Sequence, residues 1–264
     1  MEYPYEQWYN AIQVRQSCRQ FDNQPVNPDL LLNLAQFTDS LNNVFDGVRV
    51  VLVKENTEDV FKGLIGSYGK VLGAPYYAAF IGNMDDPNVQ EKLGYTGELF
   101  ILQATSLGLG TCWIAVFKPG AIIKQIELKS NEKVLTITPL GYMSKGPKAW
   151  DKRLMSFLIK SRQRKELDVL WQGLEQSKWP EWIKSALECA RLAPSAVNRQ
   201  PWRFNIENDS ITVSVDSTHL EGTVSKRLDC GIAMSHLEIG AGTKGQAGTW
   251  EYLQSPQVAR LVVS

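Results

Sequence analysis

Two segments of this 264-residue chain carry residue types that bind and orient a polar ligand. Arg15–Phe21 places two arginines four positions apart with a serine between them, and Ala193–Phe204 contains two prolines that bracket a serine, two amides and an arginine. Guanidinium groups form paired hydrogen bonds with phosphates and carbonyl edges, and amide side chains both donate and accept. The second segment therefore suits contact with the polar edge of a flat heterocycle. An ordinary polar connection has the same composition.

The arginines of the first segment follow a predicted helix. The run Trp8–Val14 has a helical pattern that extends into the segment, and on a continuing helix Arg15 and Arg19 share one face. Two like charges at this spacing repel unless an anion or an acid lies between them. The spacing alone favours the alternative, in which two solvated arginines have separate partners.

A third candidate is the basic stretch 145–165, which carries eight basic residues against one acid, Asp151. A solvated linker commonly has this composition. Its functional interpretation is contact with a phosphate.

Composition excludes several functions. Lys+Arg and Asp+Glu number 28 each, so no charge excess favours nucleic acid or an anionic membrane as a partner. No apolar run reaches the length of a membrane span and the N-terminus has no signal-peptide pattern, so a soluble, cytoplasmic protein is expected. Four cysteines without a CxxC pair and only two histidines predict neither a metal site nor a disulfide framework.

The hydrophobic pattern predicts the elements that position these segments. Helices are expected at 28–37, 97–107 and 183–192, and strands at 48–53, 76–81, 113–117, 134–140 and 204–206. Gly108 and Gly110 follow a helix, whereas the dinucleotide-binding fingerprint follows a strand and opens a helix. A classical dinucleotide-binding fold is therefore rejected.

The second half of the chain repeats the first. A shift of 195 − 40 = 155 places Ser195 on Ser40 and Asn198 on Asn43, so both copies have a helix, a Ser-x-x-Asn loop and a strand. A second match relates residues 97–113 to residues 231–250, each of which has a predicted buried helix, a glycine-rich turn and a tryptophan. Chance is the alternative explanation. If the repeat is real, the chain is a fused pseudo-dimer in which only the first half has the arginine segment and only the second has the Gln-Pro-Trp loop.

Together these motifs resemble the FMN-dependent nitroreductase family. The resemblance rests on the following segments: Arg15-x-Ser17-x-Arg19-x-Phe21, Leu107–Trp113, Pro139–Tyr142, Arg164-Lys165, Ala193-Pro194-Ser195-x-x-Asn198-x-Gln200-Pro201-Trp202-x-Phe204 and Asp229-x-Gly231-x-Ala233. An ordinary member has the Pro-Ser-x-x-Asn block soon after the arginine block, whereas here the two lie in different halves. This order matches a fused-repeat branch, in which one chain holds both subunits of the usual dimer.

The resemblance implies an α+β, nitroreductase-like fold, with mostly antiparallel central sheets packed by helices and two repeats forming an internal pseudo-dimer. The halves are expected at 1–168 and 169–264, as one intertwined unit with the flavin at their interface. A monomer fits this organisation because the dimer is internal.

The resemblance also implies the cofactor-binding residues. Arg15, Ser17 and Arg19 would bind the phosphate, ribityl and pyrimidine side of FMN, and Arg164, with Arg162 or Lys165, would complete the phosphate site. The backbone of Trp113, Ile114, Ala115 and Val116 would pass along the ring, and the second half would contribute Pro194, Ser195, Asn198 and Gln200.

The implied activity is an FMN-dependent oxidoreductase. NADH or NADPH would reduce flavin N5 by hydride transfer, and nitroaromatics, quinones or similar electron-poor small molecules would accept the electrons. No side chain is required as a nucleophile or base. One FMN per chain is expected, because the pseudo-symmetric second site lacks its motifs. The alternatives are a flavin-binding or storage protein without NAD(P)H turnover, and a structural relative without flavin.

Overall fold

A computed structural model describes residues 2–54, 57–61, 70–144, 163–218 and 224–263. The chain forms two compact units, each with its own sheet. Unit 1 comprises residues 1–13, 90–99 and 163–264, and unit 2 comprises residues 14–89 and 100–162. Within the described residues, no helix is both long and apolar enough to cross a membrane.

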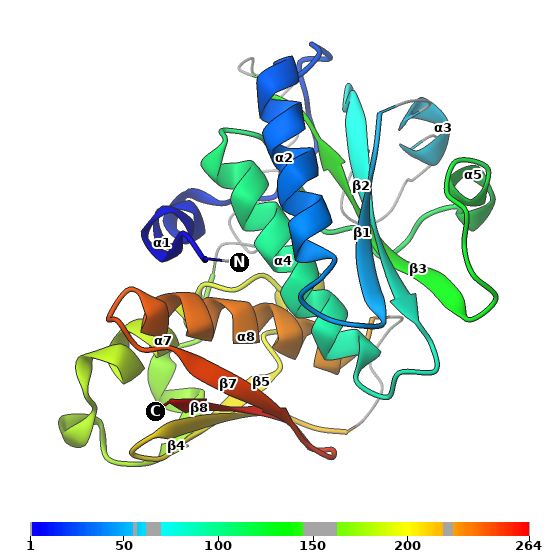
Figure 1. Cartoon of the computed structure of the whole chain (residues 1–264). Helices are drawn as coiled ribbons and strands as arrows, with labels where there is room; N and C mark the ends of the chain where they lie inside the picture. Colours follow the sequence, from blue (N-terminus) through cyan, green and yellow to red (C-terminus); the bar gives the residue numbers. More distant parts are fainter. Residues whose placement is uncertain (1, 55–56, 62–69, 145–162, 219–223, 264) are drawn as a thin grey trace. The chain divides into compact units, whose positions relative to one another are not determined.

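Unit 2 contains a three-stranded antiparallel sheet in the order β1 (Val48–Val53), β2 (Tyr76–Asn83) and β3 (Glu132–Leu140). Figure 1 shows β2 between its two neighbours, with α2 (Pro28–Leu41) beside β1. The unit also holds the short helices α3 (Thr57–Phe61) and α5 (Pro119–Ile123) and the second half of α4 (Val89–Ser106). The central strand is buried on both faces, which explains its nearly continuous apolar sequence.

Local sequence determines where α2 begins. Pro28 occupies the first turn, where its missing N–H has no helical partner to lose, and the Asn27 side chain accepts a 2.8 Å hydrogen bond from the Asp29 N–H. The predicted start is confirmed. The helix continues to Leu41, four residues beyond the predicted end, because Leu34, Thr38 and Leu41 stay buried at helical spacing.

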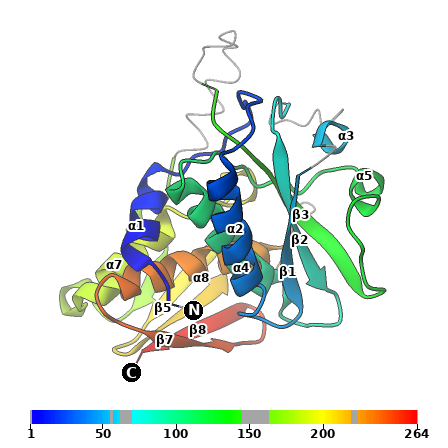
Figure 2. The ribbon, with the colours of Figure 1, turned by 45° about the horizontal axis from the view of Figure 1, so that its top comes forward.

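Unit 1 contains a five-stranded sheet in the order β4-β5-β6-β8-β7. The strands are β4 (Trp171–Gly173), β5 (Trp202–Ile206), β6 (Ser210–Val215), β7 (Gly248–Tyr252) and β8 (Gln257–Val263). Helix α8 (Lys226–Gly242) packs on this sheet and α7 (Glu181–Arg191) packs on α8 (Figure 2). The unit also contains α1 (Tyr5–Val14), apart from its last residue, and the start of α4. Short 3-10 turns occupy Leu167–Val169, Gln176–Lys178 and Ala196–Asn198.

The two units repeat one topology. In unit 2, α2 is followed by the antiparallel pair β1–β2, then α4, then β3 on the free side of β2. In unit 1, α7 is followed by the antiparallel pair β5–β6, then α8, then β8 on the free side of β6. The predicted α+β fold class with mostly antiparallel sheets is confirmed. The units exchange segments relative to the predicted halves 1–168 and 169–264, since residues 1–13 and 90–99 belong with the C-terminal segment.

Two predicted elements are wrong. The helix of residues 8–14 does not continue through Arg15–Phe21, because backbone groups there bond to other segments: the Cys18 N–H donates to the Thr111 carbonyl at 2.7 Å and the Phe21 N–H to the Leu72 carbonyl at 2.9 Å. The predicted strand 113–117 is reduced to one bridge, Ile114 with Ile137. Towards the N-terminus of this segment, Pro139 faces Cys112 and interrupts the pairing between this bridge and the bridge of Gly110 with Gly141, and the Cys112 N–H donates to the Thr138 hydroxyl.

Candidate functional site

In unit 2, the segment Arg15–Arg19 lies beside the glycine-rich segment that follows α4. Ser17 forms a parallel bridge with Thr111, and this pairing lies next to Gly110. A Cβ atom on Gly110 would stand 3.0 Å from the Cys18 sulfur and 2.7 Å from the Met143 side chain. Glycine is therefore required here for the two segments to approach each other.

Three predicted cofactor-binding residues influence one buried thiol in unit 2. The Ser17 side chain and the charges of Arg19 and Arg15 all favour the thiolate form of Cys112. Burial raises the pKa of Cys112 above its usual value, while these three groups oppose that shift. The spacing argument expected the arginines on one helix face. The helix ends at Val14, so the segment that carries both arginines is not helical.

The thiols beside this segment are not nucleophiles. Burial raises the pKa of the Cys18 thiol to about 11, and it also raises the pKa of the buried Cys112 thiol. Both therefore stay protonated at neutral pH, and a protonated thiol is a poor nucleophile. The Thr111 hydroxyl is buried without a hydrogen-bond partner among the described residues. The donor set of this segment is thus two guanidinium groups and hydroxyls.

The residues after Thr111 are only partly available to a ligand. The Trp113 ring lies 4.9 Å from the Phe80 ring, centroid to centroid. The Ile114 N–H and carbonyl both bond to Ile137, at 2.9 and 2.8 Å. Ala115 is half-buried and Val116 is exposed. The backbone at 115–116 is therefore more accessible to a ligand than that of Ile114.

In unit 1, the predicted loop after α7 has an unusual backbone. Val197, Asn198 and Gln200 all have positive φ, at 50°, 57° and 49°. Positive φ is uncommon for a residue other than glycine and is strained for a β-branched valine. Val197 is 65% exposed, so burial of its own side chain does not compensate for this strain. Contacts made by its neighbours must hold the loop.

The amide side chains of this loop hold the segment 163–165. The Lys165 N–H donates to the Gln200 Oε1 atom at 2.8 Å, and the Asn198 Nδ2 atom donates to the Gln163 carbonyl at 2.8 Å. Arg164 donates to Asn198 Oδ1 at 3.2 Å and to the Leu192 carbonyl at the end of α7 at 3.1 Å. The structure therefore brings Arg164 and Lys165 to the loop. Gln200 is buried, and the Gln200 N–H donates to the Ser195 hydroxyl at 2.9 Å.

A buried ion pair that sequence reasoning missed anchors the same loop. Asp229, near the start of α8, accepts from the Ala196 N–H at 3.0 Å and from Arg199 Nε at 2.6 Å. Arg199 also donates to the Val224 carbonyl at 3.0 Å. Burial raises the pKa of Asp229 to about 6, although Arg199 and the Ala196 N–H act in the opposite direction. The available signal was the motif Asp229-x-Gly231-x-Ala233, whose acid opens a predicted buried helix.

Positive charge accumulates beside the loop. The Lys165 ammonium donates to the Gln200 carbonyl at 3.0 Å, and its pKa is lowered by burial and by the nearby charge of Arg203. Lys226 bonds to Asp216 at 3.0 Å, and Arg203 lies 3.8 Å from the same carboxylate. Three cations thus share one acid within unit 1.

The other buried ionisable groups of unit 1 are structural. His236 Nδ1 lies 2.9 Å from the Cys189 carbonyl and Nε2 lies 3.1 Å from Glu98, so both ring nitrogens are engaged. Glu238 accepts from the Tyr95 hydroxyl at 2.8 Å and from the Trp250 indole at 2.7 Å. These contacts join α4 to α8. No cluster of metal-binding side chains occurs among the residues that the structure describes.

The predicted cofactor-binding residues therefore fall into two sets. Unit 2 holds Arg15, Ser17, Arg19, Trp113, Ile114, Ala115 and Val116, and unit 1 holds Arg164, Pro194, Ser195, Asn198 and Gln200. Arg162, with the rest of 145–162, lies outside the described residues.

Comparison with known proteins gives the family. The family model described as "Putative TM nitroreductase" matches residues 7–241. The crystal structure of a "putative nitroreductase" from Thermotoga maritima aligns with a TM-score of 0.62 and 18% identity, covering 100% of this chain and 96% of that one.

An FMN-bound nitroreductase from Bacteroides fragilis aligns with a TM-score of 0.42 and 17% identity, over 55% of this chain and 92% of that one. No curated protein sequence matches. The Thermotoga alignment shows a shared fold over the whole chain, and the family model covers most of the sequence. This chain is a member of the TM nitroreductase family.

Proposed function

We propose that this protein is an FMN-dependent oxidoreductase that takes electrons from NADH or NADPH and reduces nitroaromatics, quinones or similar electron-poor acceptors. The proposal rests on the placement of Arg15, Ser17 and Arg19 on one non-helical segment, which Ser17 and Cys18 join to Thr111. Two guanidinium groups and a hydroxyl match the phosphate and carbonyl edge of FMN in charge and hydrogen bonding. When bound, FMN supplies the hydride chemistry at its N5 atom.

The residues of the chain bind and orient the cofactor in this proposal. Arg15 and Ser17 hold the phosphate and ribityl side. Arg19 places its charge beside the pyrimidine edge, where it favours the acceptance of electrons by the ring. The protonated thiols make no covalent bond to the substrate.

Residues 40–47, the first-half counterpart of the loop after α7, support one FMN per chain. Ser40 lies inside α2 and donates to the Gln36 carbonyl, whereas its counterpart Ser195 lies beyond α7. The Asn42 side chain bonds both backbone groups of Val50, at 3.0 and 2.7 Å. The residues aligned with the Pro194–Gln200 loop thus form the end of α2 and the turn after it, not a loop of that type. Flavin released by denaturation should amount to about one molecule per chain, and two would contradict the proposal.

An anaerobic absorbance scan of the purified protein tests the activity. We expect a yellow protein that NADH or NADPH bleaches and that a quinone or nitroaromatic then re-oxidises. A yellow protein that neither nucleotide bleaches would identify a flavin-binding or storage protein, and a colourless protein that takes up no added FMN would identify a structural relative.

The Arg19→Ala variant is expected to bind FMN at least tenfold more weakly and to have a lower reduction potential. One charged hydrogen bond contributes about 1.5–3 kcal/mol, and about 1.4 kcal/mol corresponds to about 30 mV for two electrons. Fluorescence titration of the apoprotein and a spectroelectrochemical titration measure the two quantities. Arg260→Ala, on β8 of unit 1, is the control. An unchanged FMN affinity and an unchanged flavin reduction potential in Arg19→Ala would show that Arg19 does not contact the flavin.

A further inference from the structure

The surface of unit 2 contains a pocket of about 370 Å³ between the start of α2 and the adjoining ends of β1 and β2. None of the predicted cofactor-binding residues lines it. Its lining residues are Pro25, Val26, Asn27, Pro28, Leu31, Leu32, Ala35, Lys54 and Tyr76. We propose that this pocket binds a small, flat apolar molecule that carries a carboxylate.

The floor of the pocket is apolar and held by rigid backbone. Leu31 and Val26 are buried, and Leu32 presents an aliphatic side chain that is 58% exposed. Pro25 and Pro28 restrict the backbone on either side of Val26. A wall that is already ordered loses little conformational entropy when a ligand binds. The volume lies near the lower end of the range for small-molecule sites.

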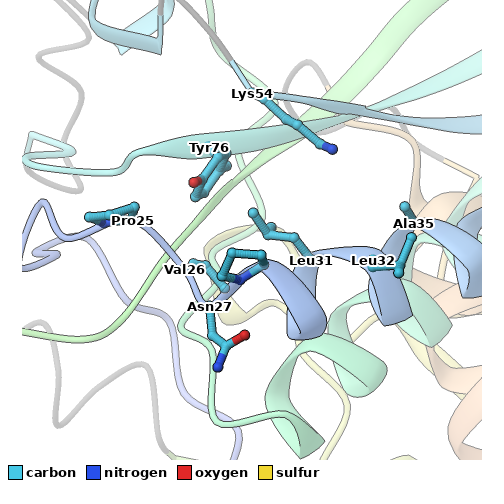
Figure 3. Close-up of a pocket in the computed structure, with 9 residues that line it drawn as sticks. Pro25, Val26, Asn27, Leu31, Leu32, Ala35, Lys54 and Tyr76 are labelled. Atoms are coloured by element: carbon cyan, nitrogen blue, oxygen red, sulfur yellow. The ribbon is translucent and has the colours of Figure 1, made fainter.

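The polar groups of the pocket select the charge of the ligand. Lys54 follows the last residue of β1 and Tyr76 begins β2, so the register of the two strands places them opposite each other. Figure 3 shows both side chains above Leu31 and Leu32. Neither the Lys54 ammonium nor the Tyr76 hydroxyl has a hydrogen-bond or ion-pair partner among the described residues.

An anion completes this arrangement. Among the residues that the structure describes, those that line the pocket include no acid, and Asp29 in the first turn of α2 is not one of them. A carboxylate can accept from Lys54 while the apolar body of the ligand covers Leu31 and Leu32 beside the Tyr76 ring. Charge-assisted hydrogen bonds of this kind are about twice as strong as neutral ones. A neutral ligand of the same shape lacks that contribution.

Calorimetric titration of the flavin-loaded, full-length protein with naphthoate tests the site. We expect a dissociation constant of about 1 mM or lower, with naphthalenemethanol, the neutral analogue, at least fivefold weaker. Lys54→Met should weaken naphthoate binding at least fivefold and leave the neutral analogue unchanged, whereas Lys124→Met, at an exposed lysine after α5, should change neither.

A second variant pair separates this pocket from the flavin site. Leu32→Glu places an acid in the pocket and should abolish naphthoate binding. Ile123→Glu is the matched control, because Leu32 and Ile123 are 58% and 57% exposed. Naphthoate affinity that survives both Leu32→Glu and Lys54→Met, or naphthoate binding that perturbs the flavin spectrum, would overturn the proposal by placing the ligand elsewhere. Absence of naphthoate binding to the wild-type protein would also overturn it.

Discussion

Replacing Arg199 with alanine is expected to lower the free energy of unfolding by about 3–5 kcal/mol at about pH 8. Asp229 is 1% exposed, and Arg199 is its only ion-pair partner among the described residues. Removing the guanidinium leaves a buried carboxylate with a single hydrogen bond, from the Ala196 N–H. The loss should also release the strained loop at 197–200, because Arg199 joins that loop to α8.

The penalty should shrink in acid, because Asp229 can take up a proton. Its pKa is about 6 in the folded protein and about 3.9 in an unfolded chain. The folded state therefore binds the proton more tightly, and stability falls as pH rises from about 4 to about 6 and is level above that. Two pKa units correspond to about 3 kcal/mol. Arg199 lowers this pKa, so its removal should extend the decline to higher pH.

Urea unfolding of the wild type, Arg199→Ala and Asp229→Asn between about pH 4 and about pH 8 measures both effects. The difference in stability between the wild type and Asp229→Asn should change by about 3 kcal/mol across this range. Lys178→Ala, which removes an exposed ion pair with Glu175, is the control and should change stability by less than about 1 kcal/mol. A difference profile that is flat with pH would show that Asp229 does not titrate as described.

Replacing Gly231 with alanine is expected to destabilise unit 1 by about 3 kcal/mol or more. A Cβ atom there would fall far inside the contact distance of the Glu91 carbonyl oxygen, and its next neighbours, the Glu91 carbonyl carbon and Cα, would lie at 2.7 and 2.8 Å. These are backbone atoms of α4, which cannot rotate away as a flexible side chain can. Gly94 meets the Leu228 carbonyl in the same way, so α4 and α8 approach through both glycines.

Gly120→Ala provides the matched comparison. Gly120 lies in the helix α5, has an ordinary φ and has no atom within 4 Å of the position that an added methyl group would occupy. That substitution should be neutral or stabilising by about 0.4–1 kcal/mol, because alanine restricts the unfolded chain. Thermal and urea unfolding should therefore separate the two variants by several kcal/mol. Equal stabilities would show that α4 and α8 can move apart at little cost.

The sequence by itself determined the three strands of unit 2, helices α2 and α7, strand β5 and the repeat, but not strands β4, β6, β7 and β8. Strand Val48–Val53 has the predicted bounds and α2 begins at Pro28 as predicted, because apolar runs and helix-start signals act through neighbours along the chain. The Ser-x-x-Asn match between residues 40–43 and 195–198 correctly indicated two copies of one topology. The family followed from motifs spread over both copies.

Only the tertiary structure decided how the candidate residues are held. The segment Arg15–Phe21 is helical in its local pattern, yet its N–H groups bond to Thr111 and Leu72, which lie far away in the sequence. The strand expected at 113–117 pairs only at Ile114, with Ile137 of the neighbouring strand. Asp229 anchors the loop at 197–200 through its ion pair with Arg199, 30 residues away in the sequence. Hydrogen bonds and ion pairs between distant segments leave no local periodicity, so these features required the folded chain.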